Sequence, residues 1–238
     1  MMEHFSITGQ RHTAACVQNQ DAICKKKSLL GRAAALADGV SSCRRAREGA
    51  QLTARSLAEL LASYGDQLSL MPSQDAASCL VGHVSYYLSR LSEKEGVPVK
   101  EYASTMIGAF WQADGNTLFT CNLGDGVILG VGQEGCRVLS CPADTSDGCP
   151  ATVTKNAAML TRVKVEDKNA FDYVVLLSDG AWPFLIEQNG RLRADVCGWL
   201  QDGKIRMVAD FLRKSFPKDD CSFVLLRRPV RDEKGEVQ

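Results

Sequence analysis

The sequence contains no apolar run long enough to cross a membrane, and its first residues, MMEHFSITGQRH, lack an apolar signal core. It also lacks an excess of charge, because 28 lysines and arginines balance 28 aspartates and glutamates. Nucleic-acid-binding domains are usually strongly basic, so this balance argues against a nucleic-acid partner. We therefore expect a cytoplasmic protein that binds neither membranes nor nucleic acids.

The cysteines of this chain do not follow a zinc-binding pattern. Ten are present, but no two are spaced as CxxC, so a zinc site is not supported. In a chain without a secretion signal we expect reduced thiols. Most of them, such as Cys121 and Cys221 within apolar runs, are interpreted as small buried side chains.

The spacing of apolar residues predicts strands, then two helices, then a run of strands. Helices are expected over 44–64 and 75–94, with shorter ones over 180–188 and 204–215. Strands are expected over 5–9, 20–25, 31–39, 102–112, 113–125, 126–132, 136–140, 159–167, 171–179 and 221–228. Because strands and helices do not alternate singly, an antiparallel α+β arrangement is favoured. We expect one domain over residues 1–228 and a loose charged tail over 229–238.

Acidic residues follow the apolar runs at the points where strands should end. They are Asp21, Asp38 in LADG, Asp179 in LSDG, and the pair Asp219 and Asp220. Mg²⁺ and Mn²⁺ prefer carboxylate, carbonyl and water oxygens. A glycine after the acid lets the backbone approach a ligand closely. Two such ions, about 3.5–4 Å apart, can activate a bridging water and clamp phosphoryl oxygens.

The alternative is that Asp-Gly pairs only form turns, which is common. This interpretation holds for the pairs at 114–115, 147–148 and 202–203. Asp38 and Asp179 differ because long apolar runs precede them, and a buried carboxylate without a partner would be costly. The GVGQEG segment at 130–135 fits GxGxxG, but a strand-like segment follows it, so a glycine-rich hairpin is expected and not a nucleotide site.

Six short motifs follow one another along the chain. They are NQD at 19–21, ADG at 37–39, YASTMIGAF at 102–110, NLGDGVILG at 122–130, LLSDGAW at 176–182 and DDCSFVLL at 219–226. Their order is similar to that of the metal-dependent protein phosphatases of type 2C. The resemblance spans about residues 5–227. It implies a four-layer αββα sandwich, two antiparallel sheets flanked by helices, and hydrolysis of phosphoserine or phosphothreonine in proteins. A target of a cognate serine/threonine kinase is one substrate that it suggests.

The resemblance also implies a centre of two Mn²⁺ or Mg²⁺ ions and assigns residues to it. Asp38 would bridge both ions and the Gly39 carbonyl would contact one, while Asp179 and Asp219 would bind the other. Asp21 would orient metal-bound water. Ser104 and Thr105 would support the site structurally, and Asp125 lies at a position associated with a weaker third ion.

The first motif, GQRHTAACVQNQDA, resembles a bacterial subgroup in which a histidine precedes a QD pair. His12 would be that histidine, and it would face the phosphate and donate a hydrogen bond. A surface or capping histidine is an equally weighted alternative.

Three positions depart from the family pattern and keep a second function open. Gln20 replaces a metal-binding acid, Cys16 replaces a phosphate-binding arginine, and Pro183 replaces an acid tied to the third ion. Arg11, Arg44 and Arg45 are the candidate substitutes for the missing arginine. The alternative function is a catalytically weak or inactive phosphatase-like binding or regulatory module. A third is a small-molecule phosphatase or a sporulation-type regulator, with the polar segment 141–156 as a flap that selects the substrate.

Overall fold

A computed structural model describes residues 2–114, 116–143, 151–167, 170–187 and 189–229. The elements in chain order are β1 (Met2–Ile7), α1 (Gln10–Ala14), β2 (Asp21–Lys27), β3 (Gly31–Asp38), α2 (Ala46–Leu70), α3 (Ser73–Glu95), η1 (Val99–Tyr102), β4 (Met106–Gln112), β5 (Thr117–Leu123), β6 (Val127–Gly132), β7 (Gly135–Ser140), α4 (Ala157–Leu160), β8 (Arg162–Asp167), β9 (Tyr173–Leu177), α5 (Trp182–Leu185), α6 (Ala194–Gln201), α7 (Ile205–Lys214) and β10 (Cys221–Arg227).

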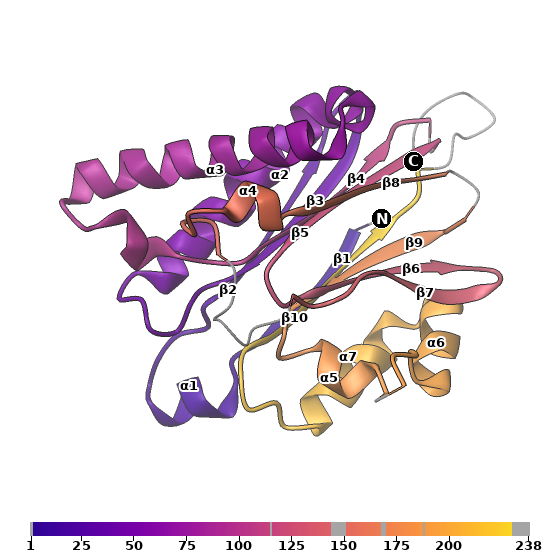
Figure 1. Ribbon diagram of the computed structural model, residues 1–238. Helices are drawn as coiled ribbons and strands as arrows, with labels where there is room; N and C mark the ends of the chain where they lie inside the picture. Colours follow the sequence, from indigo (N-terminus) through magenta and orange to yellow (C-terminus); the bar gives the residue numbers. More distant parts are fainter. Residues whose placement is uncertain (1, 115, 144–150, 168–169, 188, 230–238) are drawn as a thin grey trace.

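The strands form two five-stranded sheets in which neighbouring strands are antiparallel. Sheet 1 has the order β1-β10-β9-β6-β7, and sheet 2 has the order β2-β3-β4-β5-β8. The long helices α2 and α3 cover the outer face of sheet 2, and α5, α6 and α7 cover the outer face of sheet 1 (Figure 1). The predicted α+β sandwich of four layers is therefore confirmed.

Three apolar layers hold the sandwich together. The layer between the two sheets includes Leu36 and Ile107 from sheet 2 and Val174 and Val224 from sheet 1. A second layer lies between sheet 2 and α2 with α3, and a third lies between sheet 1 and α6 with α7. Because sheet 2 is covered on both faces, seven of the eight residues of β3 are buried, including Arg32, and buried and exposed positions do not alternate.

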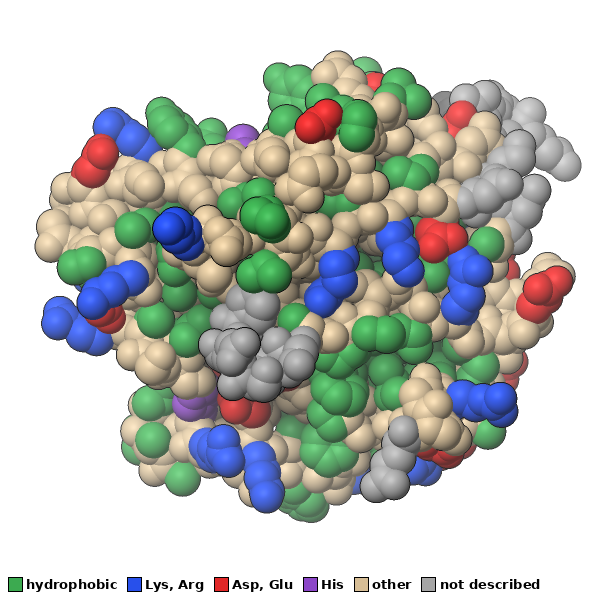
Figure 2. Space-filling model, in the orientation of Figure 1, with side chains coloured by type: hydrophobic (Ala, Val, Ile, Leu, Met, Phe, Trp, Pro, Cys, Tyr) green, Lys and Arg blue, Asp and Glu red, His purple; other side chains and the backbone are tan. Residues whose placement is uncertain are grey.

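Surface charge is mixed on the face shown in Figure 2, where basic, acidic and apolar side chains are interspersed. Within the described ranges, no helix has both the length and the apolar character of a membrane span.

Several predicted boundaries differ from the structure. The first strand ends at Ile7 instead of residue 9, and α2 continues to Leu70. The strand predicted from residue 102 begins at Met106, because Val99–Tyr102 form a short 3-10 helix and Ser104 only bridges to Gly39. The hairpin predicted for the GVGQEG segment is confirmed by the β6–β7 pairing. Residues 147–148 and 230–238 lie outside the described ranges.

Three helices, α1, α4 and α6, were not predicted. The first two have only five and four residues, which is too short for a helical period to show. Helix α6 has eight residues and buries only Val196 and Leu200, so its apolar face is narrow.

Candidate metal centre

Asp21 and Asp38 face each other across the β2–β3 pair. Asp21 begins β2, Asp38 ends β3, and the antiparallel register places them directly opposite. The Asp38 N–H donates to Thr105 Oγ1 at 2.9 Å, and the Thr105 N–H donates to the Asp38 carbonyl at 2.8 Å. The Ser104 hydroxyl in turn donates to Thr53 Oγ1 of α2 at 2.9 Å. The segment 104–105 therefore fixes the end of β3, as the resemblance implied.

The second half of the site lies where β9 ends and β10 begins in sheet 1. The Ser178 N–H donates to the Ser222 carbonyl at 3.0 Å, and the Ser222 N–H donates to Ser178 Oγ at 3.0 Å. A Cβ added at Gly180 would lie 2.0 Å from the Asp220 carbonyl oxygen. The glycine after Asp179 is therefore explained by the close approach of these two loops.

A hydrogen bond joins the two halves, because the Gln20 N–H, next to Asp21, donates to Asp220 Oδ2 at 2.6 Å. Burial raises the pKa of Asp38 well above its usual value, and the nearby carboxylates of Asp21, Asp179 and Asp125 raise it further. Burial raises the pKa of Asp179 to about 6, with Asp125 and Asp219 adding to the shift. Burial likewise raises the pKa of Asp21 to about 7, with contributions from Asp179 and Asp220. The predicted acids thus converge on one place.

The donor atoms in this cluster fit a hard divalent cation. Both carboxylate oxygens of Asp21, Oδ1 of Asp179 and Oε1 of Gln20 are buried without a hydrogen-bond partner among the described residues. No lysine or arginine in the described ranges forms an ion pair with Asp38 or Asp179. Buried carboxylates without such compensation are costly, and bound Mg²⁺ or Mn²⁺ would neutralise them.

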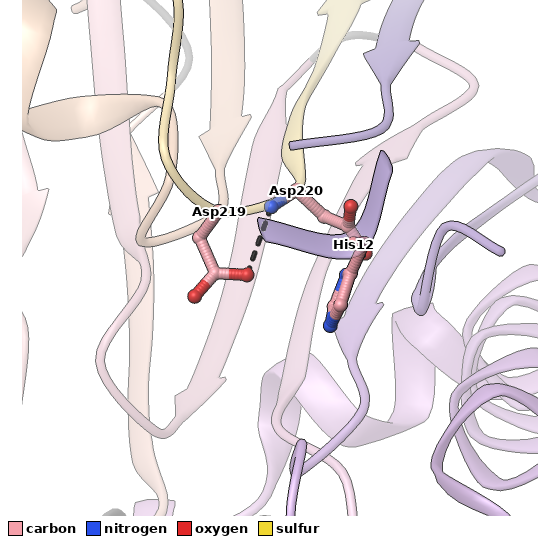
Figure 3. Close-up of side chains that lie close together, drawn as sticks. All are labelled: His12, Asp219 and Asp220. Atoms are coloured by element: carbon pink, nitrogen blue, oxygen red, sulfur yellow. Dashed lines mark hydrogen bonds and ion pairs between the residues drawn. The ribbon is translucent and has the colours of Figure 1, made fainter. Parts of the chain in front are cut away.

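Asp219 and Asp220 are adjacent in sequence but have different surroundings (Figure 3). Asp220 is buried, and its carboxylate accepts hydrogen bonds from the Gly9 N–H at 2.8 Å, the Gln20 N–H at 2.6 Å and His12 Nδ1 at 2.8 Å. Asp219 uses Oδ1 to accept the Asp220 N–H at 2.9 Å and is more exposed. Asp220 therefore holds the N-terminal motif in place, while Asp219 retains an oxygen for a ligand.

The structure also brings His12 to this cluster. His12, Asp219 and Asp220 each present a possible ligand atom within 4.8 Å of the others. The hydrogen bond to Asp220 occupies Nδ1 of His12, whose other ring nitrogen points away from Asp220 in Figure 3. This contact places His12 at the edge of the acid cluster and is compatible with both the phosphate-facing role and the capping role. The role of Asp220 was missed because its three donors lie some 200 residues away in sequence.

Asp125 lies beside the cluster because two side chains fix the β5–β6 loop. Trp182 Nε1 donates to the Asp125 carbonyl at 2.9 Å, and Asn122 Nδ2 donates to the Gly126 carbonyl at 2.9 Å. Pro183 occupies the start of α5, next to Trp182, so the acid that the resemblance pairs with Asp125 is absent there.

The candidate substitutes for the missing arginine differ in their placement. Arg45 forms ion pairs with Glu48 at 2.8 Å and Glu95 at 3.1 Å, which hold it between α2 and α3. Arg11 is exposed in α1, whose backbone is hydrogen-bonded to Pro217 and Lys218 just before Asp219. Arg44 is exposed as well, and its N–H donates to Glu101 Oε2 at 3.0 Å. Of the three, Arg11 is on the segment that borders the acid cluster.

Comparison with known proteins agrees with this arrangement. The sequence profile of the family described as protein phosphatase 2C matches residues 8–209. The chain belongs to the protein phosphatase 2C family. A search of curated protein sequences finds no match for it.

Solved structures of bacterial phosphatases share the fold of this protein phosphatase 2C member. A bacterial serine phosphatase is 14% identical with a TM-score of 0.71, and the match covers 95% of this chain and 97% of that one. The serine/threonine phosphatase Stp1 from Staphylococcus aureus is 14% identical, with a TM-score of 0.70 and coverage of 95% and 94%. The catalytic domain of the serine/threonine phosphatase PstP in complex with two manganese ions is 15% identical, with a TM-score of 0.67 and coverage of 94% and 96%.

Proposed function

We propose that this protein is a cytoplasmic phosphatase that hydrolyses phosphoserine or phosphothreonine in proteins with two Mn²⁺ or Mg²⁺ ions. The observation that carries the proposal is the convergence of Asp21, Asp38, Asp179 and Asp219 from the two sheets, with oxygens left without partners. Asp38, the Gly39 carbonyl, Asp179 and Asp219 are the proposed metal ligands. When bound, the two ions supply an activated water and neutralise phosphoryl charge.

The residues around the ligands have positioning roles in this proposal. Asp21 accepts hydrogen bonds from water in the centre, because both of its oxygens are buried and have no partner among the described residues. Asp220 fixes the ring of His12 by accepting a hydrogen bond from Nδ1, so Nε2 faces the phosphoryl group and donates a hydrogen bond there when the ring is the imidazolium. Cys16 occupies the position of the family's phosphate-binding arginine, and we propose that Arg11 takes over its role.

The proposal is tested by hydrolysis of an aryl phosphate and of a phosphothreonine peptide in Mn²⁺ and in chelator. We expect turnover only with metal, and loss of at least about 1,000-fold in Asp38→Asn protein, since a carboxylate that would hold the ions loses its charge. Asp75→Asn, an exposed acid in the first turn of α3, is the matched control and should keep full activity. Undiminished turnover in Asp38→Asn protein would refute the mechanism.

A second function, a binding or regulatory module that does not turn over phosphoprotein, is favoured by Gln20, Cys16 and Pro183. Calorimetry separates the two. Phosphopeptide binding without turnover in saturating Mn²⁺ supports the module, and metal binding with turnover excludes it.

A further inference from the structure

Two cysteines outside the acid cluster lie in direct contact. Cys136 is in β7, the edge strand of sheet 1, and Cys197 is in α6, which covers that sheet. Their sulfur atoms are 2.8 Å apart, and both residues are partly exposed. A disulfide bond is about 2.05 Å long, so the two sulfurs need to approach by less than about 1 Å.

The backbone around this pair is already held together. Gln201, one turn after Cys197, donates from Nε2 to the carbonyls of Gly132 at 3.0 Å and Gln133 at 3.3 Å, in the β6–β7 hairpin. These bonds dock α6 on the hairpin that carries Cys136, so little backbone movement is needed. No other two cysteines in the described ranges share such a contact.

We propose that Cys136 and Cys197 form a reversible disulfide when the protein meets a peroxide, and that this bond fastens α6 to β7. The Cys197 thiolate attacks one oxygen of the peroxide, the O–O bond breaks, and a sulfenic acid forms as hydroxide leaves. The Cys136 sulfur then attacks the Cys197 sulfur, the S–O bond breaks and water leaves. In total, two thiols and one hydrogen peroxide give one disulfide and two waters.

The order of these steps follows from the two environments. Burial raises the pKa of the Cys136 thiol, and the neighbouring Cys197 sulfur raises it further, so Cys136 is a poor first nucleophile. Cys197 therefore takes the oxygen, and Cys136, already in contact, resolves the sulfenic acid before further oxidation. A small thiol reverses the bond by disulfide exchange.

The disulfide would close a loop that contains Asp179. Cys136 and Cys197 are 61 residues apart, and the chain between them includes β8, β9 and α5. A cross-link across a loop of this length stabilises mainly by restricting the unfolded chain. The oxidised protein should therefore unfold at a higher temperature than the reduced protein, whether or not the proposed phosphatase activity exists.

Peptide mapping of the full chain after treatment with dilute hydrogen peroxide tests the proposal. Free thiols are alkylated in denaturant, so that the buried Cys121 and Cys221 also react, and the protein is digested with trypsin without reduction. We expect the peptides 101–137 and 194–204 to be joined, and two of the ten thiols to escape alkylation. The thermal midpoint should rise by about 5–10 °C and return after dithiothreitol.

Single variants define the pair. Cys136→Ser and Cys197→Ser should each abolish the joined peptide and the thermal shift, whereas Cys141→Ser, at an exposed cysteine just after β7, should keep both. The wild-type map is decisive even if a variant fails to fold. The proposal is overturned if both thiols remain alkylatable, if Cys197 is oxidised to sulfinic acid without a cross-link, or if the bond joins two chains.

Discussion

Asp220 shows that identical neighbouring residues can have separate functions when their hydrogen bonds differ. Its carboxylate accepts three hydrogen bonds from the segment 9–20, whereas the Asp219 carboxylate accepts the N–H of Asp220. The sequence pattern indicated Asp21, Asp38, Asp179 and the pair of Asp219 and Asp220, because each lies where an apolar run begins or ends, and the family resemblance singled out Asp219. It could not indicate the partners of Asp220, since those contacts depend on how distant segments pack.

We expect Asp219→Asn and Asp220→Asn to impair different properties, metal binding and stability. Loss of a residue that hydrogen-bonds to a metal ligand typically lowers metal affinity by about 10–100-fold. Asp219→Asn removes a proposed ligand itself, so Mn²⁺ affinity should fall by more than this, with little change in stability. Asp220→Asn presents an amide N–H₂ to at least one donor, so the free energy of unfolding should fall by about 2–3 kcal/mol. Calorimetry and urea denaturation measure the two effects, and the same profile for both variants would contradict this division.

Asp21 provides a prediction for the metal-free protein. Its pKa is raised to about 7, mainly by burial, so the folded protein holds this proton more tightly than the unfolded chain. The resulting stability is present below the unfolded pKa of about 3.9 and is lost as the pH rises toward 7.

Urea denaturation in chelator should therefore show wild type losing stability relative to Asp21→Asn between pH 4 and 7, by about 2–4 kcal/mol. Asparagine cannot ionise, so the variant is the control for every pH effect that does not come from Asp21. If the difference in stability between the two proteins did not change with pH, the pKa of Asp21 would be the same in the folded protein as in the unfolded chain.

At the scale of elements, long amphipathic helices and apolar strands were predictable, whereas short elements and close approaches were not. Helices α2 and α3 follow from repeated apolar spacing over more than 20 residues. Helix α1 has no buried residue, so nothing in its apolar pattern could reveal it. The proximity of Cys136 and Cys197 was also hidden, because it depends on the docking of α6, a helix that was itself missed.

Gly180 tests the contact between the β9 and β10 loops. A Cβ at Gly180 would meet the Asp220 carbonyl at 2.0 Å, so Gly180→Ala should push the loops apart, reduce stability by about 1–3 kcal/mol and weaken Mn²⁺ binding. Gly82→Ala in α3 is the control, because nothing lies within 4 Å of the added Cβ and alanine favours a helix by about 0.5–1 kcal/mol. Thermal melts and Mn²⁺ titrations of both variants measure these effects. Unchanged Mn²⁺ binding in Gly180→Ala would contradict the close packing of the two loops.

At the scale of the whole molecule, the candidate metal centre joins the two sheets. Asp21 and Asp38 belong to sheet 2, while Asp179 and Asp219 flank strands of sheet 1. The four-layer arrangement was predictable from motif order, since the resemblance covers nearly the whole chain. The repulsion among the acids of the cluster was not predictable, because it arises only when the two sheets pack against each other.

Metal should therefore stabilise the entire fold. A ligand at about 100 times its dissociation constant adds about 2.7 kcal/mol, which for a chain of this size raises the thermal midpoint by about 5–10 °C. Melting in MnCl₂ and in chelator measures this shift, and Asp38→Asn protein should lose most of it. An equal shift in that variant would place the stabilising ion elsewhere.

The pairing of β1 with β10 has a consequence for synthesis on the ribosome. Met2 lies opposite Leu226, so the first strand of the chain is hydrogen-bonded to the last. Because β10 also separates β1 from the rest of sheet 1, a nascent polypeptide cannot complete that sheet until Arg227 has left the exit tunnel. Until Asp220 itself has emerged, the N-terminal segment, including His12 and Gln20, lacks its hydrogen-bond partner, and the emerging chain is exposed to chaperones and proteases.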